Sequence, residues 1–339
     1  MQKRISQREI ARLANVRQET VSAVLNPNSR GNTRVSTESR ERILRIAAEH
    51  NYRPNLQARI LRGDSGSNLI GVLINARISQ FFYDLLLPLE VELRKRHRRM
   101  IIGQLGNDAA EAESVLQNFI DYNLDGVIVL HHDISDGRRL FNHYLPLLPE
   151  TVFLEVPPGV SGAAAVSIDF ANGVREAVAH LAAGGRRRIA LCMNDLRFLS
   201  MQMRLEGYRR GLEEAGRPFD ESLIFIREPR PDYTFAELIS DAVDLLAVRG
   251  KADAVIAGND EWALALLREM NRRGLPVPGK VALVGYGNIL NICRSTTPEL
   301  TSIHHGMEEL AAKLAAALEK PGTQFPPVLS HLVVRQSSI

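Results

Sequence analysis

Hydrophobic and polar residues near the start of the chain follow the period of two short amphipathic helices. Apolar residues recur at i, i+3 and i+4 in residues 6–15 and again in residues 18–26. Ser6 and Glu9 have the spacing of a capping box, and Asn15 tolerates the left-handed conformation in which helices often end. The second stretch leaves polar side chains outward, a surface that a DNA major groove accepts. The pattern predicts a helix-turn-helix, although any two amphipathic helices with a short turn share this spacing.

From residue 69 onward, strand-like apolar runs alternate with helical periods. A first series begins with LIGVLIN at 69–75 and ends at AAVSID, 164–169. A second series ends with KVALVGYGN at 280–288, and a strand-like run near 329–334 closes the chain. This alternation predicts parallel sheets with right-handed crossovers, arranged as two doubly wound α/β subdomains.

The composition adds few constraints beyond an ordinary globular chain, with 45% apolar and 24% charged residues among 339. No apolar run approaches the roughly 18 residues of a membrane span. The first residues lack the apolar segment of a signal peptide, so we expect a cytoplasmic protein. Cys192 and Cys293 are too few for a disulfide framework or a structural zinc site, and we expect buried thiols and no metal or cofactor.

The charge is distributed unevenly along the chain. Residues 1–63 carry 13 Lys+Arg against 5 Asp+Glu, a balance of +8, whereas the remainder carries 29 against 34, a balance of −5. A basic head on an acidic body is typical of a polyanion-binding module attached to a domain that does not bind polyanions. RNA or an acidic protein would satisfy the charge equally well, and the helix-turn-helix pattern favours duplex DNA.

Residues 11–26, ARLANVRQETVSAVLN, resemble the DNA-binding headpiece of the lactose/galactose repressor (LacI/GalR) family of bacterial transcription regulators. VSTESRERI at 35–43 and NYRPNLQARILR at 51–62 extend the resemblance through the hinge of that family. It continues in SQFF at 79–82, SIDFANG at 167–173, HLAAGGRRRIA at 180–190, RLEGY at 204–208, GND at 258–260, VALVGYGN at 281–288 and TPELTSI at 297–303.

The resemblance implies three parts and a periplasmic-binding-protein-like core. The parts are a helix-turn-helix domain at 1–53, a hinge helix and linker at 54–68, and an effector-binding and dimerisation domain at 69–339. Within the last part, the expected first subdomain covers about 69–166 and 299–325, and the second covers about 167–298 and 326–339. The chain stops at Ile339 without the family's tetramer-forming helix, so we expect a homodimer.

The family also implies which residues contact a near-palindromic operator. We expect Arg17, Gln18 and Glu19 to read bases, and Glu19 suits a cytosine amino group. The family usually has serine where Arg17 stands and frequently arginine where Ala23 stands, so the helix cap is weaker and the operator should differ. Ala23 would contribute at most a contact with a thymine methyl group. Backbone or further contacts are expected from Ser6, Thr20, Ser22, Asn26, Arg30, Arg34 and Tyr52.

Two of these expectations have open alternatives. Arg30 and Arg34 lie in a loop rich in Asn, Pro and Gly, and a solvated loop explains them as well as phosphate contacts do. In the hinge, Leu61 matches the leucine that the family inserts into the minor groove, with Ala58 and Arg59 at the family's Ala-Arg positions. Alternatively, Leu61 anchors the linker to the core.

The same resemblance places a small-molecule effector between the two subdomains. Positions that match the family's ligand contacts are Asn75, Ser79, Phe81, Phe82, Glu155, Arg204, Asn259 and Asp260. Arg204 suits a carboxylate, a phosphate or vicinal hydroxyls, and a salt bridge with Glu206 is the alternative. One of the two phenylalanines is expected in the core, and Trp262 either lines the cleft or packs. 

The sequence departs from the sugar-binding pattern of the family after Tyr286. Gly287 and Asn288 stand where family members usually carry an aspartate that accepts hydrogen bonds from ligand hydroxyls. Without this carboxylate and with Arg204 retained, we expect a weak preference for a sugar acid, a sugar phosphate or another small anion. 

The sequence supports two other functions less well than it supports a DNA-binding regulator. An enzyme is disfavoured because HExxH, P-loop and GxSxG motifs are absent, and Leu290 stands where a dinucleotide fingerprint beginning at Gly285 needs glycine. An exported binding protein of the same architecture is disfavoured by the basic head. We therefore expect a DNA-binding regulator, with repression as the expected output.

Overall fold

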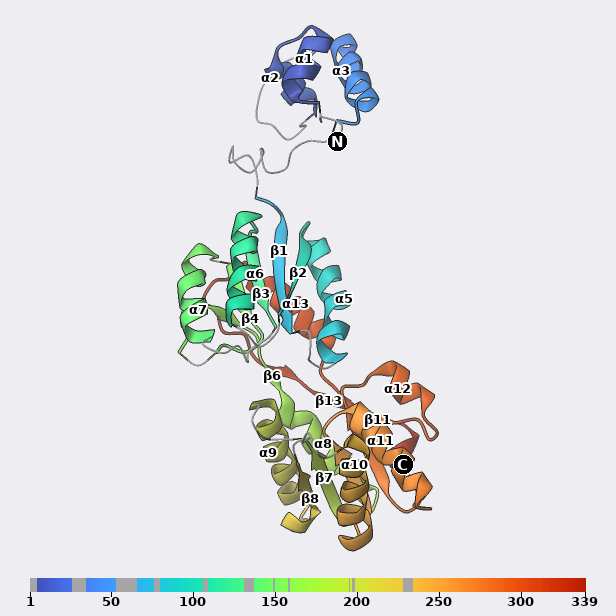
Figure 1. Cartoon of the computed structure of the whole chain (residues 1–339). Coiled ribbons are helices and arrows are strands. Elements are labelled where there is room, and N and C mark those ends of the chain that lie inside the picture. The colour runs from blue at the N-terminus through green and yellow to red at the C-terminus, as the bar shows by residue number, and fades with distance from the viewer. Residues whose placement is uncertain are drawn as a thin grey trace. The chain divides into compact units, whose positions relative to one another are not determined.

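A computed structural model describes residues 5–25, 35–52, 66–75, 80–105, 109–130, 137–148, 150–157, 159–194, 196, 199–227 and 234–339 (Figure 1). The chain forms two compact units, one comprising Met1–Leu69 with Phe119–Asp125 and the other comprising Ile70–Asn118 with Gly126–Ile339. Within the first unit, Asp125 is joined to the segment before β1 (Leu69–Asn75): its carboxylate accepts hydrogen bonds from the Ser67 amide at 2.8 Å and from the Asn68 amide at 2.8 Å.

The described N-terminal residues, 5–25 and 35–52, form a helical head. Its helices are α1 (Gln7–Ala14), α2 (Gln18–Leu25) and α3 (Thr37–Glu49). The capping box is confirmed: the Ser6 amide donates to the Glu9 carboxylate at 2.9 Å and the Glu9 amide donates to Ser6 Oγ at 3.2 Å. Asn15 ends α1 with a φ of 51°, as the left-handed exit predicts.

The apolar faces of the three helices pack into one small core. Ile10, Val21 and Ile43, one from each helix, are completely buried in it. Val16 fills the turn between α1 and α2, and Arg42 Nε donates to the Ala14 carbonyl at 3.0 Å, which fixes α3 against the end of α1. The helix-turn-helix predicted from spacing is therefore the structure that forms.

The first subdomain contains a sheet with strand order β2-β1-β3-β4-β5. Parallel pairing joins β1 to β3, β3 to β4 and β4 to β5. The strands are β1 (Leu69–Asn75), β2 (Arg99–Leu105), β3 (Gly126–Val129), β4 (Glu150–Phe153) and β5 (Ala164–Ala165). Figure 1 shows its helices around the sheet: α5 (Gln80–Lys95), α6 (Ala109–Asp121), α7 (Gly137–Tyr144) followed by the 3₁₀ turn η1 (Leu145–Leu147), and α13 (Met307–Ala317), which packs against α5.

The second subdomain contains a sheet with strand order β13-β11-β10-β9-β7-β8. Neighbouring strands of this sheet are parallel except β13, which runs antiparallel to β11. The strands are β7 (Ile189–Met193), β8 (Ile224–Ile226), β9 (Ala254–Ala257), β10 (Ala282–Tyr286), β11 (Thr301–His304) and β13 (His331–Val333). Its helices are α8 (Phe170–Ala183), α9 (Leu199–Glu214), α10 (Phe235–Val243), α11 (Asp260–Arg272) and α12 (Leu290–Ser295), with short turns η2 (Glu221–Leu223), η3 (Asp244–Arg249) and η4 (Gln336–Ser338).

Short crossover segments connect the two subdomains. β6 (Ile168–Asp169) pairs with β12 (Val328–Leu329), and Ala165 bridges to Gln324. β11 pairs with β10 and β13, so it belongs to the second sheet, and the expected return to the first subdomain at about residue 299 is wrong. The chain returns to the first subdomain only after β11. The sequence could not predict this, because an apolar run predicts a strand and does not reveal which sheet the strand joins.

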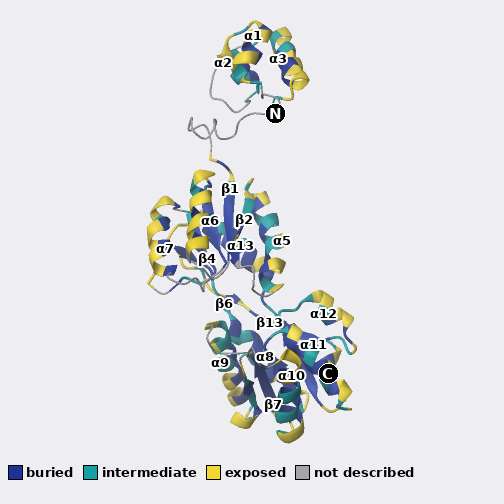
Figure 2. Ribbon diagram, viewed as in Figure 1, coloured by how far each residue is buried: buried dark blue, intermediate teal, exposed yellow. Residues whose placement is uncertain are grey.

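The buried strands account for the continuous apolar runs in the sequence. Strands β3, β7, β9 and β10 are buried throughout, as expected for parallel sheets covered by helices on both faces. Figure 2 shows the dark blue sheets of both subdomains and the exposed outer faces of their helices. Cys192 and Cys293 are buried free thiols, as predicted. Among the described residues, no helix is long and apolar enough to cross a bilayer.

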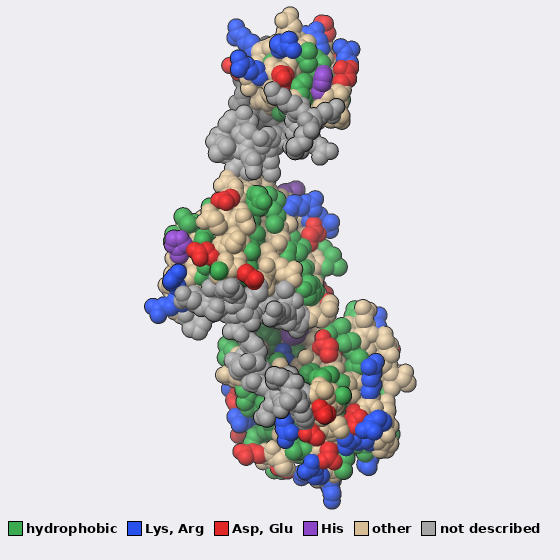
Figure 3. All heavy atoms as spheres, viewed as in Figure 1, with side chains coloured by type: hydrophobic (Ala, Val, Ile, Leu, Met, Phe, Trp, Pro, Cys, Tyr) green, Lys and Arg blue, Asp and Glu red, His purple; other side chains and the backbone are tan. Residues whose placement is uncertain are grey.

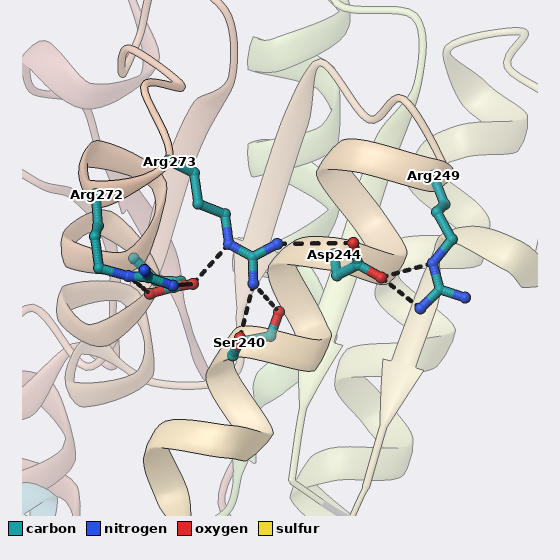
Figure 4. Close-up of polar contacts among 6 residues, drawn as sticks. Ser240, Asp244, Arg249, Arg272 and Arg273 are labelled. Carbon is teal, nitrogen blue, oxygen red and sulfur yellow. Dashed lines mark hydrogen bonds and ion pairs between the residues drawn. The ribbon is translucent and has the colours of Figure 1, made fainter.

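An arginine network holds the π-helical turn η3 at the end of α10 (Figure 4). Arg273 donates from Nε to Glu269 at 2.6 Å and from Nη2 to the Ser240 carbonyl at 2.9 Å. Its Nη1 lies 3.7 Å from the Asp244 carboxylate, which also accepts from Arg249 Nε at 2.6 Å. Hydrogen bonds from Arg272 and Arg273 lower the pKa of Glu269 to about 2. These contacts connect α10 and α11 on the surface of the second subdomain.

Candidate functional site

The start of α2 exposes the three residues expected to read bases. Arg17, Gln18 and Glu19 are exposed, and the Arg17 carbonyl accepts from the Thr20 amide at 3.0 Å and the Val21 amide at 3.3 Å. Arg17 therefore occupies the N-cap position, where its guanidinium offers no acceptor for the first amides of the helix. The solvent-facing start of a recognition helix is where base contacts are made in helix-turn-helix proteins.

The other expected DNA contacts divide into three groups. Thr20, Ser22 and Ala23 are half-buried on α2, and Ser6 caps α1. Tyr52 packs against the core of the head, and its amide donates to the Ala47 carbonyl at 2.8 Å, a structural role that does not test a DNA contact. The residues that lie outside the described part of the chain are Asn26, Arg30, Arg34, Ala58, Arg59 and Leu61.

Most of the net positive charge of residues 1–63 comes from residues outside the described part of the chain. Figure 3 shows arginine side chains on the visible face of the helical head, with acidic side chains beside them. Within residues 1–63, the basic residues outside the described residues are Lys3, Arg4, Arg30, Arg34, Arg53, Arg59 and Arg62, and the same segments, 1–4, 26–34 and 53–63, contain no Asp or Glu. Attraction to phosphate is therefore expected to come largely from these residues, and base reading by the polar residues at the start of α2 stays a prediction.

Arg204, the central residue of the expected effector site, is only 7% exposed. Nη1 donates to the Gly258 carbonyl, and the guanidinium carbon lies 3.7 Å from the centre of the Tyr286 ring and 5.5 Å from that of Phe170. Nε has no hydrogen-bond partner among the described residues. Burial lowers the pKa of the guanidinium. The alternative salt bridge is not formed, because Glu206 pairs with Arg210 at 2.7 Å.

His305 joins the same group, and the sequence did not single it out as a ligand contact. The imidazole is 3% exposed, and its ring centre lies 4.6 Å from Phe81, 4.9 Å from Tyr286 and 5.8 Å from Phe170. Nδ1 has no hydrogen-bond partner among the described residues. Burial, followed by the charges of Arg204 and His304, holds the pKa well below its usual range. The sequence feature that could have identified His305 is its position directly after β11, where the chain passes from the second subdomain to α13 of the first.

These residues form what we call the Arg204 cluster: Phe81, Phe170, Arg204, Tyr286 and His305. Phe81 comes from α5 of the first subdomain, and Arg204 and Tyr286 come from α9 and β10 of the second. Phe82 is buried in the core and contacts Phe81 edge to face at 4.9 Å, which confirms that one of the two phenylalanines is a core residue. The cluster thus joins elements of both subdomains around two buried nitrogen-rich side chains.

Asn259 and Asp260 have structural roles at the start of α11. Asn259 Oδ1 caps the helix by accepting from the Trp262 amide at 2.8 Å. The completely buried Asp260 accepts from Ser302 Oγ at 2.6 Å and from the Ile289 amide at 2.6 Å. Burial raises the pKa of this carboxyl group to about 6 despite these hydrogen bonds. Whether either residue also contacts an effector stays a prediction.

The remaining expected effector contacts are less central. Trp262 is 6% exposed and packs edge to face on Phe235, so it fills the core of the second subdomain. Asn288 has a φ of 54°, and its side-chain oxygen accepts from Arg335 at 2.7 Å. Glu155 is half-buried. The side chain of Asn75 and the whole of Ser79 lie outside the described residues.

The helical head and the two doubly wound subdomains define the class of protein: a DNA-binding regulator with a core of the periplasmic-binding-protein type. Residues 7–55 match the family of bacterial regulatory proteins, lacI family, and residues 178–338 match the periplasmic binding protein-like domain. The transcriptional regulator CelR of Thermobifida fusca is 30% identical over 340 residues, covering 97% of this chain and 96% of the relative. The chain belongs to the LacI family of bacterial transcriptional regulators.

Solved structures agree with this assignment. A CelR–cellobiose complex is 26% identical with a TM-score of 0.66, covering 98% of this chain and all (100%) of that chain. The lac repressor dimer bound to operator and the anti-inducer ONPF is 22% identical with a TM-score of 0.78, covering 99% and 100% respectively, and supports the fold. The protein is a DNA-binding transcriptional regulator and not an enzyme, since its relatives are transcriptional regulators.

Proposed function

We propose that the protein is a dimeric repressor whose operator affinity is set by a small metabolite bound at the Arg204 cluster. The observation that carries this proposal is the unpartnered Nε of a nearly buried arginine, placed among aromatic rings from both subdomains. Because Phe81 belongs to one subdomain and Arg204 to the other, a ligand between them favours one arrangement of the subdomains over another. Its effect on operator affinity is limited by its difference in affinity for the two arrangements.

The effector is proposed to be a sugar acid, a sugar phosphate or another small anionic metabolite. The complex of the similar CelR holds cellobiose, a neutral sugar. In this chain, glycine and asparagine occupy the positions of the usual aspartate, and the Asn288 side-chain oxygen is engaged by Arg335. The Asp260 carboxylate is occupied by Ser302 and Ile289. These features favour a ligand rich in acceptors over one rich in hydroxyl donors.

On DNA, each protomer would place α2 in the major groove of one half of a near-palindromic operator. Arg17, Gln18 and Glu19 would read bases, and the hinge residues Ala58, Arg59 and Leu61 would meet at the centre of the site. Such operators lie on the bacterial nucleoid, where we propose that the protein acts. Repression follows if the bound dimer blocks transcription.

A second copy of the chain would bury apolar side chains around a groove of about 920 Å³. The groove is lined by α5 residues such as Tyr83 and Leu87 and by the segment that follows β10, including Leu290. Leu87 is 72% exposed and Leu290 is 50% exposed, so both leave apolar surface that a second copy would remove from water. We propose this groove as the dimer surface.

Substitutions at the exposed start of α2 are expected to change which operator bases are preferred. Selection of DNA sequences by the intact protein should yield a near-palindromic site, and substitution Gln18→Ala or Glu19→Gln should relax or change the preferred bases. One lost base contact should cost about 1–3 kcal/mol of discrimination, or roughly tenfold to hundredfold in relative affinity. 

Arg8→Ala serves as the control for this selection, because Arg8 is an exposed residue of α1 away from the start of α2. It should leave the preferred bases unchanged. Identical preferences in the Gln18 and Glu19 variants would refute the assigned reading residues. A wild-type protein without salt-sensitive duplex binding would refute the operator-binding function itself.

A further inference from the structure

Two buried side chains in the Arg204 cluster hold hydrogen-bonding nitrogens for which the described residues supply no partner. Arg204 Nε and His305 Nδ1 are the atoms concerned. The two side chains contact the same two rings, since Tyr286 lies 3.7 Å from the guanidinium and 4.9 Å from the imidazole, and Phe170 lies 5.5 Å and 5.8 Å from them. Unpartnered buried polar atoms are costly, so this geometry indicates a missing acceptor.

The acidic groups nearest the cluster are engaged elsewhere. Asp169 caps α8 by accepting from the Ala171 amide at 2.9 Å and the Asn172 amide at 3.1 Å. Asp260, whose charge acts on Arg204, is occupied by Ser302 and by the amide that follows Asn288. No described carboxylate pairs with Arg204 by salt bridge, so its positive charge is not balanced by a contacting side chain of the described residues.

The other titratable groups around His305 add no negative charge at neutral pH. His304 is adjacent, and its Nδ1 accepts from the Gly306 amide at 3.1 Å, so that ring is neutral in this arrangement. Tyr286 donates its hydroxyl hydrogen to the Phe170 carbonyl at 3.3 Å, and burial raises its pKa, which keeps the phenol neutral. His305 in the free protein is therefore neutral, held so by burial and by the neighbouring Arg204.

We propose that His305 and Arg204 together hold the anionic group of the effector, and that His305 takes up a proton when this group binds. The proposal rests on the effector role of the Arg204 cluster. Beyond that role, it makes His305 a residue that determines specificity and couples effector binding to the uptake of one proton. Solvent supplies one proton to the free Nδ1 of His305, and the resulting imidazolium donates a hydrogen bond to the anion. Arg204, already charged, donates from Nε.

The physical consequence is an affinity that depends on pH. An anion beside the imidazole favours its charged form, so the pKa of His305 rises from below its usual range in the free protein to above it in the complex. Between those two values, each binding event consumes one proton, and affinity increases about tenfold for each unit by which the pH falls. Neutral ligands would show no such dependence.

The test uses sulfate and D-gluconate, whose charges are constant between pH 6 and pH 8, and D-glucose as the neutral probe. Isothermal titration of the full-length protein at pH 6, 7 and 8, in buffers that differ in ionisation enthalpy, gives both affinity and proton uptake. We expect binding of at least one anion to weaken about a hundredfold from pH 6 to pH 8, with about one proton taken up per site at pH 7. 

Variants separate the two side chains. His305→Gln should bind the anion with no pH dependence and no proton uptake, and Arg204→Gln should lose anion binding. Arg210→Gln, on the same helix but exposed and paired with Glu206, should behave as the unmodified protein does. The proton count on the unmodified protein keeps the test decisive even if His305→Gln fails to fold.

Binding of an anion without proton uptake, or no binding of either anion, would overturn the proposal. Binding of D-glucose alone would also overturn it, yet would leave effector control of operator binding intact. Operator affinity of the same protein samples, measured in parallel, distinguishes these results from failure of the proposed function, which would appear as absent duplex binding.

Discussion

The core of the second subdomain holds the carboxyl group of Asp260 where water is excluded. This carboxyl group is completely buried, and burial raises the pKa to about 6 although Ser302 Oγ, the Ile289 amide and Cys293 Sγ all donate to it. These hydrogen bonds connect the start of α11 to the segment after β10. The sequence suggested a ligand contact here, whereas the described contacts give the carboxylate a structural task.

The raised pKa predicts a particular pH dependence of stability. Since the unfolded carboxyl group titrates near pH 3.8, the folded state binds more protons between about pH 4 and pH 6. The contribution of Asp260 is therefore most favourable below pH 4 and declines as the pH rises through 6, by about 2–3 kcal/mol in total. Urea unfolding between pH 4.5 and 7.5 should show this decline in the unmodified protein and a flatter profile for Asp260→Asn. Parallel profiles would contradict it.

His305 and Trp262 mark the limit of residue-level prediction. The sequence motif singled out Arg204, whose effector contact stays a prediction, but the unpartnered Nδ1 of His305 became visible only when β11, α5 and β10 were brought together. Trp262 packs against Phe235 in the core of the second subdomain, and an effector contact of this residue stays a prediction. Burial depends on contacts between distant segments, which a single sequence does not specify.

At the scale of elements, local signals predicted what local physics controls. The Ser6 capping box and the left-handed Asn15 are short-range features, and each forms as expected. Most helix and strand positions followed from periodicity. The assignment of β11 to the second sheet and the existence of the short helix α12 did not, because the first depends on long-range pairing and the second is too short for a periodic signal.

The contact between β10 and α11 gives a prediction about packing. A Cβ atom on Gly285 would lie 2.2 Å from Asp260 Oδ1 and 3.0 Å from a Leu300 methyl group, and the buried strand cannot shift cheaply. Gly285→Ala should therefore destabilise the protein by about 2–4 kcal/mol in chemical denaturation. Gly279→Ala is the matched control, since its nearest new contact is 3.9 Å away, and it should change stability by less than about 0.5 kcal/mol. Equal stability of the two variants would contradict the packing.

At the scale of the whole molecule, the proposed dimer should depend on the groove beside α5 and α12. Leu87→Asp or Leu290→Asp would place a charge in a surface that the second copy desolvates, so dissociation should be favoured at least tenfold in sedimentation experiments. Leu147→Asp provides the control, because Leu147 is 56% exposed on η1 and does not line the groove. Dissociation by Leu147→Asp alone, or by none of the three, would exclude this surface.

The whole molecule combines a head that the sequence specifies well with a core whose ligand it specifies poorly. The helix-turn-helix, the two subdomains and the LacI family follow from motifs and periodicity and agree with the comparisons. Effector identity depends on how side chains from α5, α9 and β10 meet, and on the loss of one carboxylate beside Asn288. We therefore propose that a ligand at the Arg204 cluster controls DNA binding.

The most direct test is fluorescence anisotropy of a selected operator, titrated with the protein in the absence and presence of a ligand. The ligand would come from a thermal-shift screen of sugars, sugar acids and sugar phosphates. We predict that the stabilising ligand is an anion that changes the operator Kd at least fivefold in the unmodified protein and in Arg210→Gln, but not in Arg204→Gln. A ligand that stabilises the protein and leaves the operator Kd unchanged, or acts equally on Arg204→Gln, would contradict the account.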